Sequence, residues 1–476
     1  MDLGRYREDA ESFVTALSRE HYHHFAGLKP SLEIEQLYEA YAHLFTPAAV
    51  DDVRSAGTPA LAEFCVEGFI GRATTSETAQ LAEREASLEL DLDGRRVPFR
   101  QAAIEQANEP DAGRRAAIEQ ARLELTEREL DPLLRAVLDR TRELSGELGY
   151  SSAGAMCSEL SGIDLPALAR QMEGLLEATA DEYDTVALPR VAAELGVDRP
   201  RRSDLPAFFR AAGLDAHFPQ SKLLASLSDT MEGLGISVDG RVRLDTEARP
   251  TKSPRAFCVP VEVPDEVYLV ISPHGGRDDY EALLHEAGHA HHYASVEAGL
   301  DFERRHLGDN SVTESYAFLM QRLATEPEWL ARHLSADCAP EVSEHARAAK
   351  LIFLRRYAAK LAYELELYGA DPGDADTLRR SYAGHLSDAL RVQWPEETWL
   401  ADVDPFFYAA RYLRAWSLEA SLTRDLRERF GSAWFAEPEA GDELTRLWAE
   451  GQPARADELM GTPDPAALIE ELAPRA

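Results

Sequence analysis

Apolar side chains recur at three- and four-residue steps through most of this 476-residue chain, and no other feature constrains the fold as strongly. In the segment 31–45 they fall on one helical face, and the pattern stops before a Thr-Pro pair, which is typical of a helix end. The same pattern occupies the segments 114–148, 165–195, 341–367 and 409–430. We therefore predict a mainly α fold.

One segment, 256–271, departs from this pattern because it is rich in β-branched residues and predicts two short strands. Pro260 and Pro264 cannot donate a backbone hydrogen bond, so at least the first strand is expected at a sheet edge. The Pro-rich stretch 249–254 just before it predicts a boundary. We expect an N-terminal helical lobe over 1–250 and a C-terminal lobe over 251–476 that carries the chemistry.

The charge balance excludes some classes of partner. Lys and Arg number 50 and Asp and Glu 85, so the formal net charge is −35. Such a surface repels phosphate backbones and anionic lipids, and we expect neither nucleic acid nor membrane as a partner. No long apolar run and no apolar leader are visible, and the four cysteines are scattered without a CxxC pair. These features predict a protein of a reducing compartment, the cytoplasm.

A metal-binding pattern follows the predicted strands. His285 and His289 are four residues apart, which on a helix places both imidazoles on one face. Two such imidazoles can share one Zn²⁺, and Glu286 beside them is placed to take a proton from a water that the zinc acidifies. Ala287 and Gly288 inside the motif are small, which allows another segment to approach closely.

A catalytic zinc site needs a third protein ligand. Glu314 lies at the start of the next amphipathic stretch and would complete a His₂Glu site. His306 is the competing third ligand, but it lacks the HExxHxxGxxH spacing of sites with three histidines. We predict one Zn²⁺ per chain, bound by His285, His289 and Glu314.

These residues resemble the thimet oligopeptidase and oligoendopeptidase F family of zinc peptidases, whose pattern is HExGHxxH followed by a glutamate that opens another helix. The matching residues here are His285, Glu286, Gly288, His289, His292 and Glu314. The resemblance implies a two-lobed helical fold with a deep central channel, a small β-sheet next to the motif helix, and cleavage of short unfolded peptides.

A second, weaker match lies in the segment 404–416, where the family has a tyrosine-rich stretch that supplies phenol hydroxyls to the oxyanion. The resemblance assigns Tyr408 and Tyr412 to this stretch, with Tyr412 as the main oxyanion partner. The next tyrosine position falls on Ala415 or Arg414. An arginine there would offer a permanent positive charge to the oxyanion instead.

The surroundings of the site give further expectations. Ligand histidines usually donate their second N–H to a carboxylate or carbonyl, and Asp309 and Glu281 are the candidates for that role. His292, one turn beyond His289, is expected to contact the substrate or the surroundings of the ligands. The strand 267–271 is expected to pair with an extended peptide along an exposed edge.

The sequence therefore predicts a zinc metalloendopeptidase that hydrolyses short unfolded peptides with Glu286 as general base. Two alternatives remain open. The same site can serve a zinc amide hydrolase that acts on one small or modified peptide metabolite. A catalytically silent peptide-binding scaffold is the other alternative, although none of the motif residues is lost. The sequence leaves the oligomeric state open.

Overall fold

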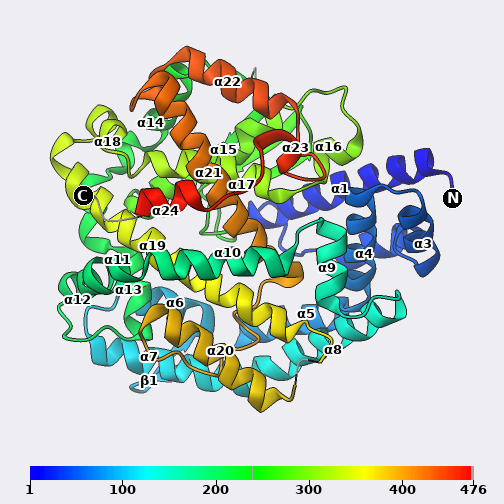
Figure 1. Cartoon of the computed structure of the whole chain (residues 1–476), viewed down its shortest axis with the longest axis horizontal. Coiled ribbons are helices and arrows are strands. Elements are labelled where there is room, and N and C mark those ends of the chain that lie inside the picture. Colours follow the sequence, from blue (N-terminus) through cyan, green and yellow to red (C-terminus); the bar gives the residue numbers. More distant parts are fainter. Residues whose placement is uncertain (239, 372, 473–476) are drawn as a thin grey trace. The chain divides into compact units, whose positions relative to one another are not determined.

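The computed structural model describes residues 1–238, 240–371 and 373–472. Helices dominate it, and the described part contains two small sheets, so the prediction of a mainly α fold is confirmed (Figure 1). None of the described helices has the length and apolar character needed to cross a membrane.

Contacts between residues divide the chain into two compact units, each assembled from separate stretches. The first unit contains residues 1–69, 213–344 and 414–471, and the second contains residues 70–212, 345–413 and Leu472. This partition differs from the single division expected near residue 250, because that position lies inside the first unit.

The first unit contains the predicted chemistry and most of the strands. Its helices, with those shared across the boundary included, are α1 (Leu3–Phe25), α2 (Ile34–Ala40), η1 (Ala42–Leu44), α3 (Pro47–Ser55), α4 (Pro59–Ala73), η5 (Ala212–His217), α14 (Gln220–Gly233), α15 (Arg277–Ser295), α16 (Phe302–His306), α17 (Asn310–Leu323), α18 (Pro327–His333), η6 (Ala336–Cys338), α19 (Ala339–Leu367), α21 (Tyr408–Phe430), η8 (Trp434–Ala436), α22 (Pro438–Ala449), α23 (Asp457–Met460) and α24 (Ala466–Leu472).

The second unit is helical apart from one hairpin of β1 (Glu89–Leu92) and β2 (Arg95–Pro98). Leu90 and Val97 of this hairpin pack with Ile118 and Leu130 in one apolar cluster. The helices of this unit are α5 (Thr75–Ser87), α6 (Phe99–Asn108), α7 (Ala112–Leu125), η2 (Thr126–Leu130), α8 (Asp131–Glu147), α9 (Ala153–Ser161), α10 (Leu165–Ala178), α11 (Ala180–Glu182), η3 (Tyr183–Ala187), α12 (Leu188–Leu195), η4 (Arg202–Asp204), α13 (Leu205–Arg210), α20 (Ala375–Leu390) and η7 (Pro405–Phe407), together with most of α19 and the start of α21.

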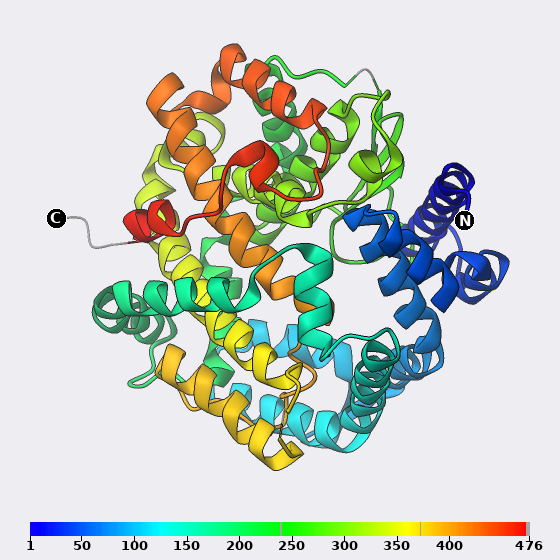
Figure 2. The same ribbon diagram turned by 45° about the vertical axis from the view of Figure 1, so that its right-hand side comes forward.

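The helices α19 and α20 of the second unit pack against each other (Figure 2). The rings of Tyr363 and Tyr382 meet edge-on at 5.1 Å, and Arg355 donates from Nε to the carbonyl oxygen of Ala389 at 2.8 Å. Arg355 is buried, so this bond to a helix-terminal carbonyl satisfies two groups that would otherwise lie in the core without a partner.

The sheet of the first unit contains β3 (Val242–Asp245), β4 (Phe257–Glu262) and β5 (Glu266–Val270) in the order β3-β5-β4. β5 pairs with β4 in antiparallel and with β3 in parallel orientation. The two strands predicted in 256–271 are confirmed, and so is the edge position of the first. The expectation that 267–271 offers a free edge is wrong, because β5 has a strand on each side. The outer strands of this sheet are β3 and β4.

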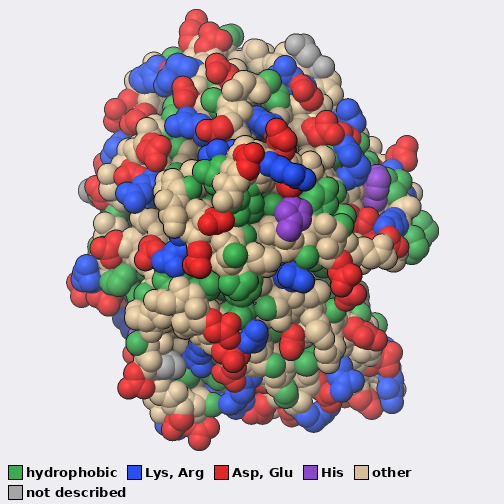
Figure 3. Space-filling view, turned by 90° about the vertical axis from the view of Figure 1, so that its right-hand side faces the viewer, with side chains coloured by type: hydrophobic (Ala, Val, Ile, Leu, Met, Phe, Trp, Pro, Cys, Tyr) green, Lys and Arg blue, Asp and Glu red, His purple; other side chains and the backbone are tan. Residues whose placement is uncertain are grey.

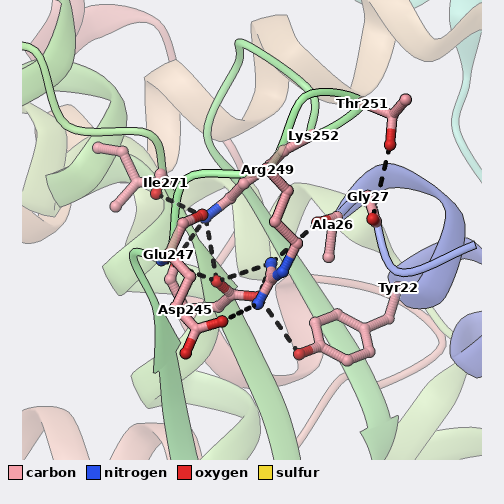
Figure 4. Close-up of polar contacts among 9 residues, drawn as sticks. All are labelled: Tyr22, Ala26, Gly27, Asp245, Glu247, Arg249, Thr251, Lys252 and Ile271. Atoms are coloured by element: carbon pink, nitrogen blue, oxygen red, sulfur yellow. Dashed lines mark hydrogen bonds and ion pairs between the residues drawn. The ribbon is translucent and has the colours of Figure 1, made fainter.

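A buried network of hydrogen bonds holds the loop between β3 and β4 in place (Figure 4). The ammonium of Lys252 donates to the carbonyl oxygens of Asp245 and Ile271 at 2.9 Å and to the Asp245 carboxylate at 3.0 Å. Arg249 donates to the same carboxylate at 2.8 Å and to the carbonyl oxygen of Ala26 at 2.9 Å. These bonds tie the loop to the sheet and to the end of α1, which explains why the chain does not divide near residue 250.

Acidic and basic side chains are interspersed over the face shown in Figure 3. Some of these charges pair in the described residues of the chain: Arg19 donates to Glu262 and Glu266 at 2.9 Å each. Exposed ion pairs of this kind stabilise a fold by at most ~1 kcal/mol each, so they contribute little to determining the fold.

The motif helix α15 begins at a turn formed by Gly275 and Gly276, whose φ angles are 83° and 91°. The Asp279 carboxylate accepts from the N–H groups of His274 and Gly275 in that turn. The backbone N–H of Arg277 at the helix start donates to the Asp215 carboxylate at 3.1 Å. The turn and its carboxylates therefore fix where α15 starts and which face it presents to α17.

Gly288 permits the close packing of α15 against α17, which lie side by side (Figure 1). A Cβ at this position would lie 2.6 Å from the Cα of Ala317 and 2.6 Å from the carbonyl oxygen of Tyr316. Both neighbours are backbone atoms, which cannot move aside without shifting a helix. The sequence-based expectation that a small residue here admits another segment is confirmed.

We expect Gly288→Ala to lower the free energy of unfolding by about 1–3 kcal/mol, because the added methyl forces the two helices apart. The matched control is Gly174→Ala in α10, where an added Cβ meets nothing within 4 Å. That change should stabilise the helix by up to ~1 kcal/mol. Urea unfolding of both variants measures these changes in the free energy of unfolding. Equal midpoints for Gly288→Ala and the parent protein would contradict the expected destabilisation.

Candidate metal centre

His285, His289 and Glu314 meet between α15 and α17. The Nε2 atoms of both histidines lie 3.6 Å from the same oxygen of Glu314, and one ligand atom of each residue lies within 4.8 Å of the others. The Glu314 side chain is 6% exposed, whereas those of His285 and His289 are 19% and 13% exposed. Two imidazoles and one carboxylate converging in this way fit Zn²⁺, with the histidine side open to solvent.

His306, the competing third ligand, is not part of this group. It ends α16, and within the described residues the cluster able to hold a metal contains Glu314 in its place. Burial, followed by the charge of Arg305, lowers the pKa of His306 to about 4. The structure therefore favours the His₂Glu set over a site with three histidines.

The second nitrogen of each ligand histidine is held by a neutral side chain of α17. The Nδ1 atom of His285 donates to the amide oxygen of Gln321 at 2.9 Å, and Nδ1 of His289 lies 2.8 Å from the hydroxyl oxygen of Thr313. The Thr313 hydroxyl is also hydrogen-bonded to Tyr293. With Nδ1 engaged, each ring presents Nε2 to Glu314, which is the tautomer that metal binding requires.

The two carboxylates expected to orient the histidines have other partners. Asp309 begins α17 as its cap, accepts from the N–H of Ser311 at 2.9 Å, and pairs with Arg414 at 2.9 Å. Glu281 lies 3.5 Å from Arg277, one turn earlier on α15. The orienting groups are Gln321 and Thr313 instead, so this expectation is corrected. Arg414 donates to Asp309 at the start of the helix that bears Glu314.

The sequence analysis did not predict that Gln321 orients a ligand histidine, although its spacing from Glu314 gives an indication. Glu314 and Gln321 are seven residues apart, so both lie on one face of α17. Thr313 directly precedes the ligand. Neither could be recognised before it was known which face of α17 meets α15.

We expect Gln321→Leu to weaken zinc binding about 10- to 100-fold, because the His285 ring loses the acceptor that orients it. Gln321→Glu is the matched control, since it keeps an oxygen acceptor at the same place and should retain affinity. Competition against a chromogenic chelator measures both. Equal zinc affinities for the leucine and glutamate variants would show that the hydrogen bond does not position the ligand.

Glu286 projects beside the metal group and is held by the edge strand. Its carboxylate accepts from the backbone N–H of Cys258, in β4, at 2.9 Å. Burial raises the pKa of Glu286 to about 7. A carboxylate with a pKa near neutrality can both take up and return a proton, which suits a general base.

The ionisation of His285 also suits a ligand. Burial, and then the neighbouring His289, lowers the pKa of His285 to about 4. The ring is therefore neutral at physiological pH, and the neutral form is the one that binds a metal.

His292 lies in the core and not on a surface that a substrate could reach. Its side chain is fully buried, and its ring packs against Tyr293 at 5.1 Å and Tyr316 at 5.0 Å. Burial, and then the neighbouring His289, lowers its pKa to about 3. A packing role between α15 and α17 therefore replaces the expected substrate contact.

Tyr408 and Tyr412 occupy the first turns of α21, in the second unit. Their rings meet edge-on with centroids 4.9 Å apart, and Tyr412 also meets Tyr357 at 5.7 Å. Both side chains are partly exposed. Their part in stabilising an oxyanion stays a prediction.

Comparison with known proteins bears on the fold. No protein-family model matches the chain, and no curated protein matches its sequence. Among solved structures, a candidate oligoendopeptidase F from Bacillus anthracis str. Ames matches at a TM-score of 0.63 and 14% identity, over 95% of this chain and 83% of that one. PZ peptidase A with a bound inhibitor matches at a TM-score of 0.65 and 14% identity, over 95% of this chain and 85% of that one.

Both structural neighbours are peptidases by their descriptions, and the alignment extends over nearly the whole of this chain. At 14% identity the likeness concerns the course of the backbone and not the individual side chains. The resemblance that the HExGHxxH pattern indicated is thus confirmed at the level of structure: the chain has the fold of the oligoendopeptidase F and PZ peptidase structures.

Proposed function

We propose that the protein is a zinc-dependent peptidase that hydrolyses short unfolded peptides. The observation that carries the proposal is the convergence of His285, His289 and Glu314, with Glu286 beside them at a raised pKa. The likeness to peptidase structures supports it, because a fold shared with peptidases and a candidate metal centre occur in one chain.

In the proposed reaction His285, His289 and Glu314 would hold the zinc, which would supply a water molecule of lowered pKa and polarise the scissile carbonyl. Glu286 accepts a proton from the attacking water and passes it to the leaving amine. Gln321 and Thr313 keep the imidazole rings of His285 and His289 oriented during both proton transfers. Tyr412, with Tyr408 as a lesser partner, is expected to donate a phenol hydrogen bond to the developing oxyanion.

The substrate backbone has a docking edge in β4. This strand is one of the two outer strands of its sheet, and its Cys258 donates from the backbone N–H to the carboxylate of Glu286. A peptide that adds to the edge as a further strand would therefore lie next to the general base. This arrangement takes the place of the pairing expected for 267–271.

A peptide library of mixed sequence tests the proposal directly. Zinc-loaded protein should cleave many short unfolded peptides, and removal of the metal with a chelator should stop cleavage until zinc is restored. Cleavage of a single amide or modified peptide from a parallel panel, with the library untouched, would favour the zinc amide hydrolase. Zinc binding without turnover of any substrate would favour the peptide-binding scaffold.

A further inference from the structure

A strained turn leads into the two tyrosines at the start of α21. Phe406 and Phe407 have φ angles of 53° and 55°, which lie in the left-handed region. Residues with a Cβ adopt this region at a cost, and bulky ones seldom do so. Elsewhere among the described residues, a positive φ outside glycine occurs only at single positions. Two such residues in succession need contacts that hold them, and residues held in this way cluster at functional sites.

The beginning of this turn is held from α19 by polar contacts. The ammonium of Lys360 donates to the carboxylate of Asp404 at 2.6 Å, and the backbone N–H of Asp404 donates to the carboxylate of Glu364 at 3.1 Å. Lys360 and Glu364 are one helical turn apart, and both side chains are buried. Burial raises the pKa of Glu364 to about 8, so the charges that pair at pH 7 are those of Lys360 and Asp404. A pair with so little access to solvent is screened only weakly by salt, and it fixes the residue at which the turn begins.

The end of the turn is held by packing. Phe407 is buried, and its ring meets that of Tyr368, the residue after α19, at 5.2 Å. The turn is therefore anchored to α19 or to its end at both Asp404 and Phe407. These anchors set the direction in which the chain enters α21 at Tyr408.

Lys360 also reaches the tyrosines through an aromatic ring. Its Nζ atom lies 5.1 Å from the ring centroid of Tyr357, a geometry in which the cation is attracted to the ring. The ring of Tyr357 meets that of Tyr412 edge-on at 5.7 Å, and Tyr412 meets Tyr408 at 4.9 Å. One lysine thus contacts both the turn before α21 and the ring beside Tyr412. All of these residues belong to the second unit, whereas the proposed metal ligands belong to the first.

We propose that Lys360 is a positioning residue, which through Asp404 and Tyr357 holds the phenol of Tyr412 in the place from which it donates to the oxyanion. This inference rests on the proposed function, in which Tyr412 has that role. Lys360 itself touches no reacting atom. Stabilisation of developing charge depends on donors that are already in place, so loss of Lys360 should lower kcat and leave KM nearly unchanged.

A double-mutant cycle tests whether Lys360 acts through Tyr412. Lys360→Met should lower kcat about tenfold, because the phenol is displaced but still present. Tyr412→Phe removes the hydroxyl and should lower kcat about 10²-fold. In the Tyr412→Phe background, Lys360→Met should change kcat by less than about twofold, since the group that it positions is already gone.

Arg355→Met is the matched control, because Arg355 is another buried cation of α19. It donates to the carbonyl oxygens of Ala389 and Leu176 and not to the turn before α21. Its replacement should lower the midpoint of urea unfolding and leave kcat within a few-fold of the parent. If Lys360→Met does not yield folded protein, Asp404→Asn removes the same ion pair at nearly unchanged size and should show the same coupling.

Fluorine NMR of protein with 3-fluorotyrosine in place of Tyr412 gives a readout that does not depend on turnover. Lys360→Met should shift or broaden this resonance, and Arg355→Met should leave it as in the parent. An unchanged resonance in Lys360→Met, or an equal loss of kcat with and without the Tyr412 hydroxyl, would overturn the inference. A shifted resonance in a protein that cleaves no peptide would instead count against the peptidase function alone.

Discussion

Glu286→Gln should lower kcat for peptide cleavage by about 10²- to 10⁴-fold, because the amide cannot take the proton from the attacking water. Zinc content should stay unchanged, since Glu286 is not among the converging ligand atoms. The near-equal size of the two side chains keeps the hydrogen bond from the N–H of Cys258 possible. Steady-state kinetics and metal analysis on the same preparation measure both effects.

The matched control is Glu281→Gln, which makes the same change on the same helix. Glu281 is partly buried near Arg277 and does not belong to the metal group. Its replacement should leave kcat within a few-fold of the parent. If Glu286→Gln cleaves peptides at the parent rate, another group removes the proton, and the assignment of the general base fails.

Glu314→Ala should weaken zinc binding by more than the ~100-fold that loss of an outer hydrogen-bond partner costs, because it removes one of three ligands. Peptide cleavage should fall in proportion to the bound zinc. Glu297→Ala is a suitable control, since Glu297 is exposed just beyond the end of α15. Competition with a chelator measures the affinities of the two variants.

Unchanged zinc affinity in Glu314→Ala would mean that another residue is the third ligand. His306→Ala in the same assay would then have to show the loss instead. The present geometry predicts that it will not, because His306 lies outside the cluster.

Local spacing made the centre of the site predictable. The four-residue separation of His285 and His289 fixes their shared face as soon as the segment is helical, and the start of the next helix brings Glu314 within reach. The small residue at Gly288 was equally readable, because tight helix crossings need room at the backbone. These inferences needed no knowledge of the rest of the chain.

Features that depend on distant pairing were not predictable in this way. β5 lies at the centre of its sheet because β3, a strand of only four residues with two charged side chains, joins it in parallel. Such a strand carries almost no periodic signal. The two units combine stretches far apart in sequence, which no boundary signal between neighbouring residues can reveal.

The hairpin of β1 and β2 was missed despite a signal. Asp93 and Gly94 form its turn, with φ angles of 57° and 82°, and an Asp-Gly pair between alternating apolar residues is a strong hairpin indication. The helical periodicity on both sides of this segment concealed it.

Diffraction at the zinc absorption edge, from crystals of the protein grown with zinc, tests the central claim most directly. The proposal predicts one strong anomalous peak per chain, about 2.0–2.2 Å from Nε2 of His285, Nε2 of His289 and a carboxylate oxygen of Glu314. A map with no peak between these three side chains, or with the zinc bound elsewhere in the chain, would contradict the account.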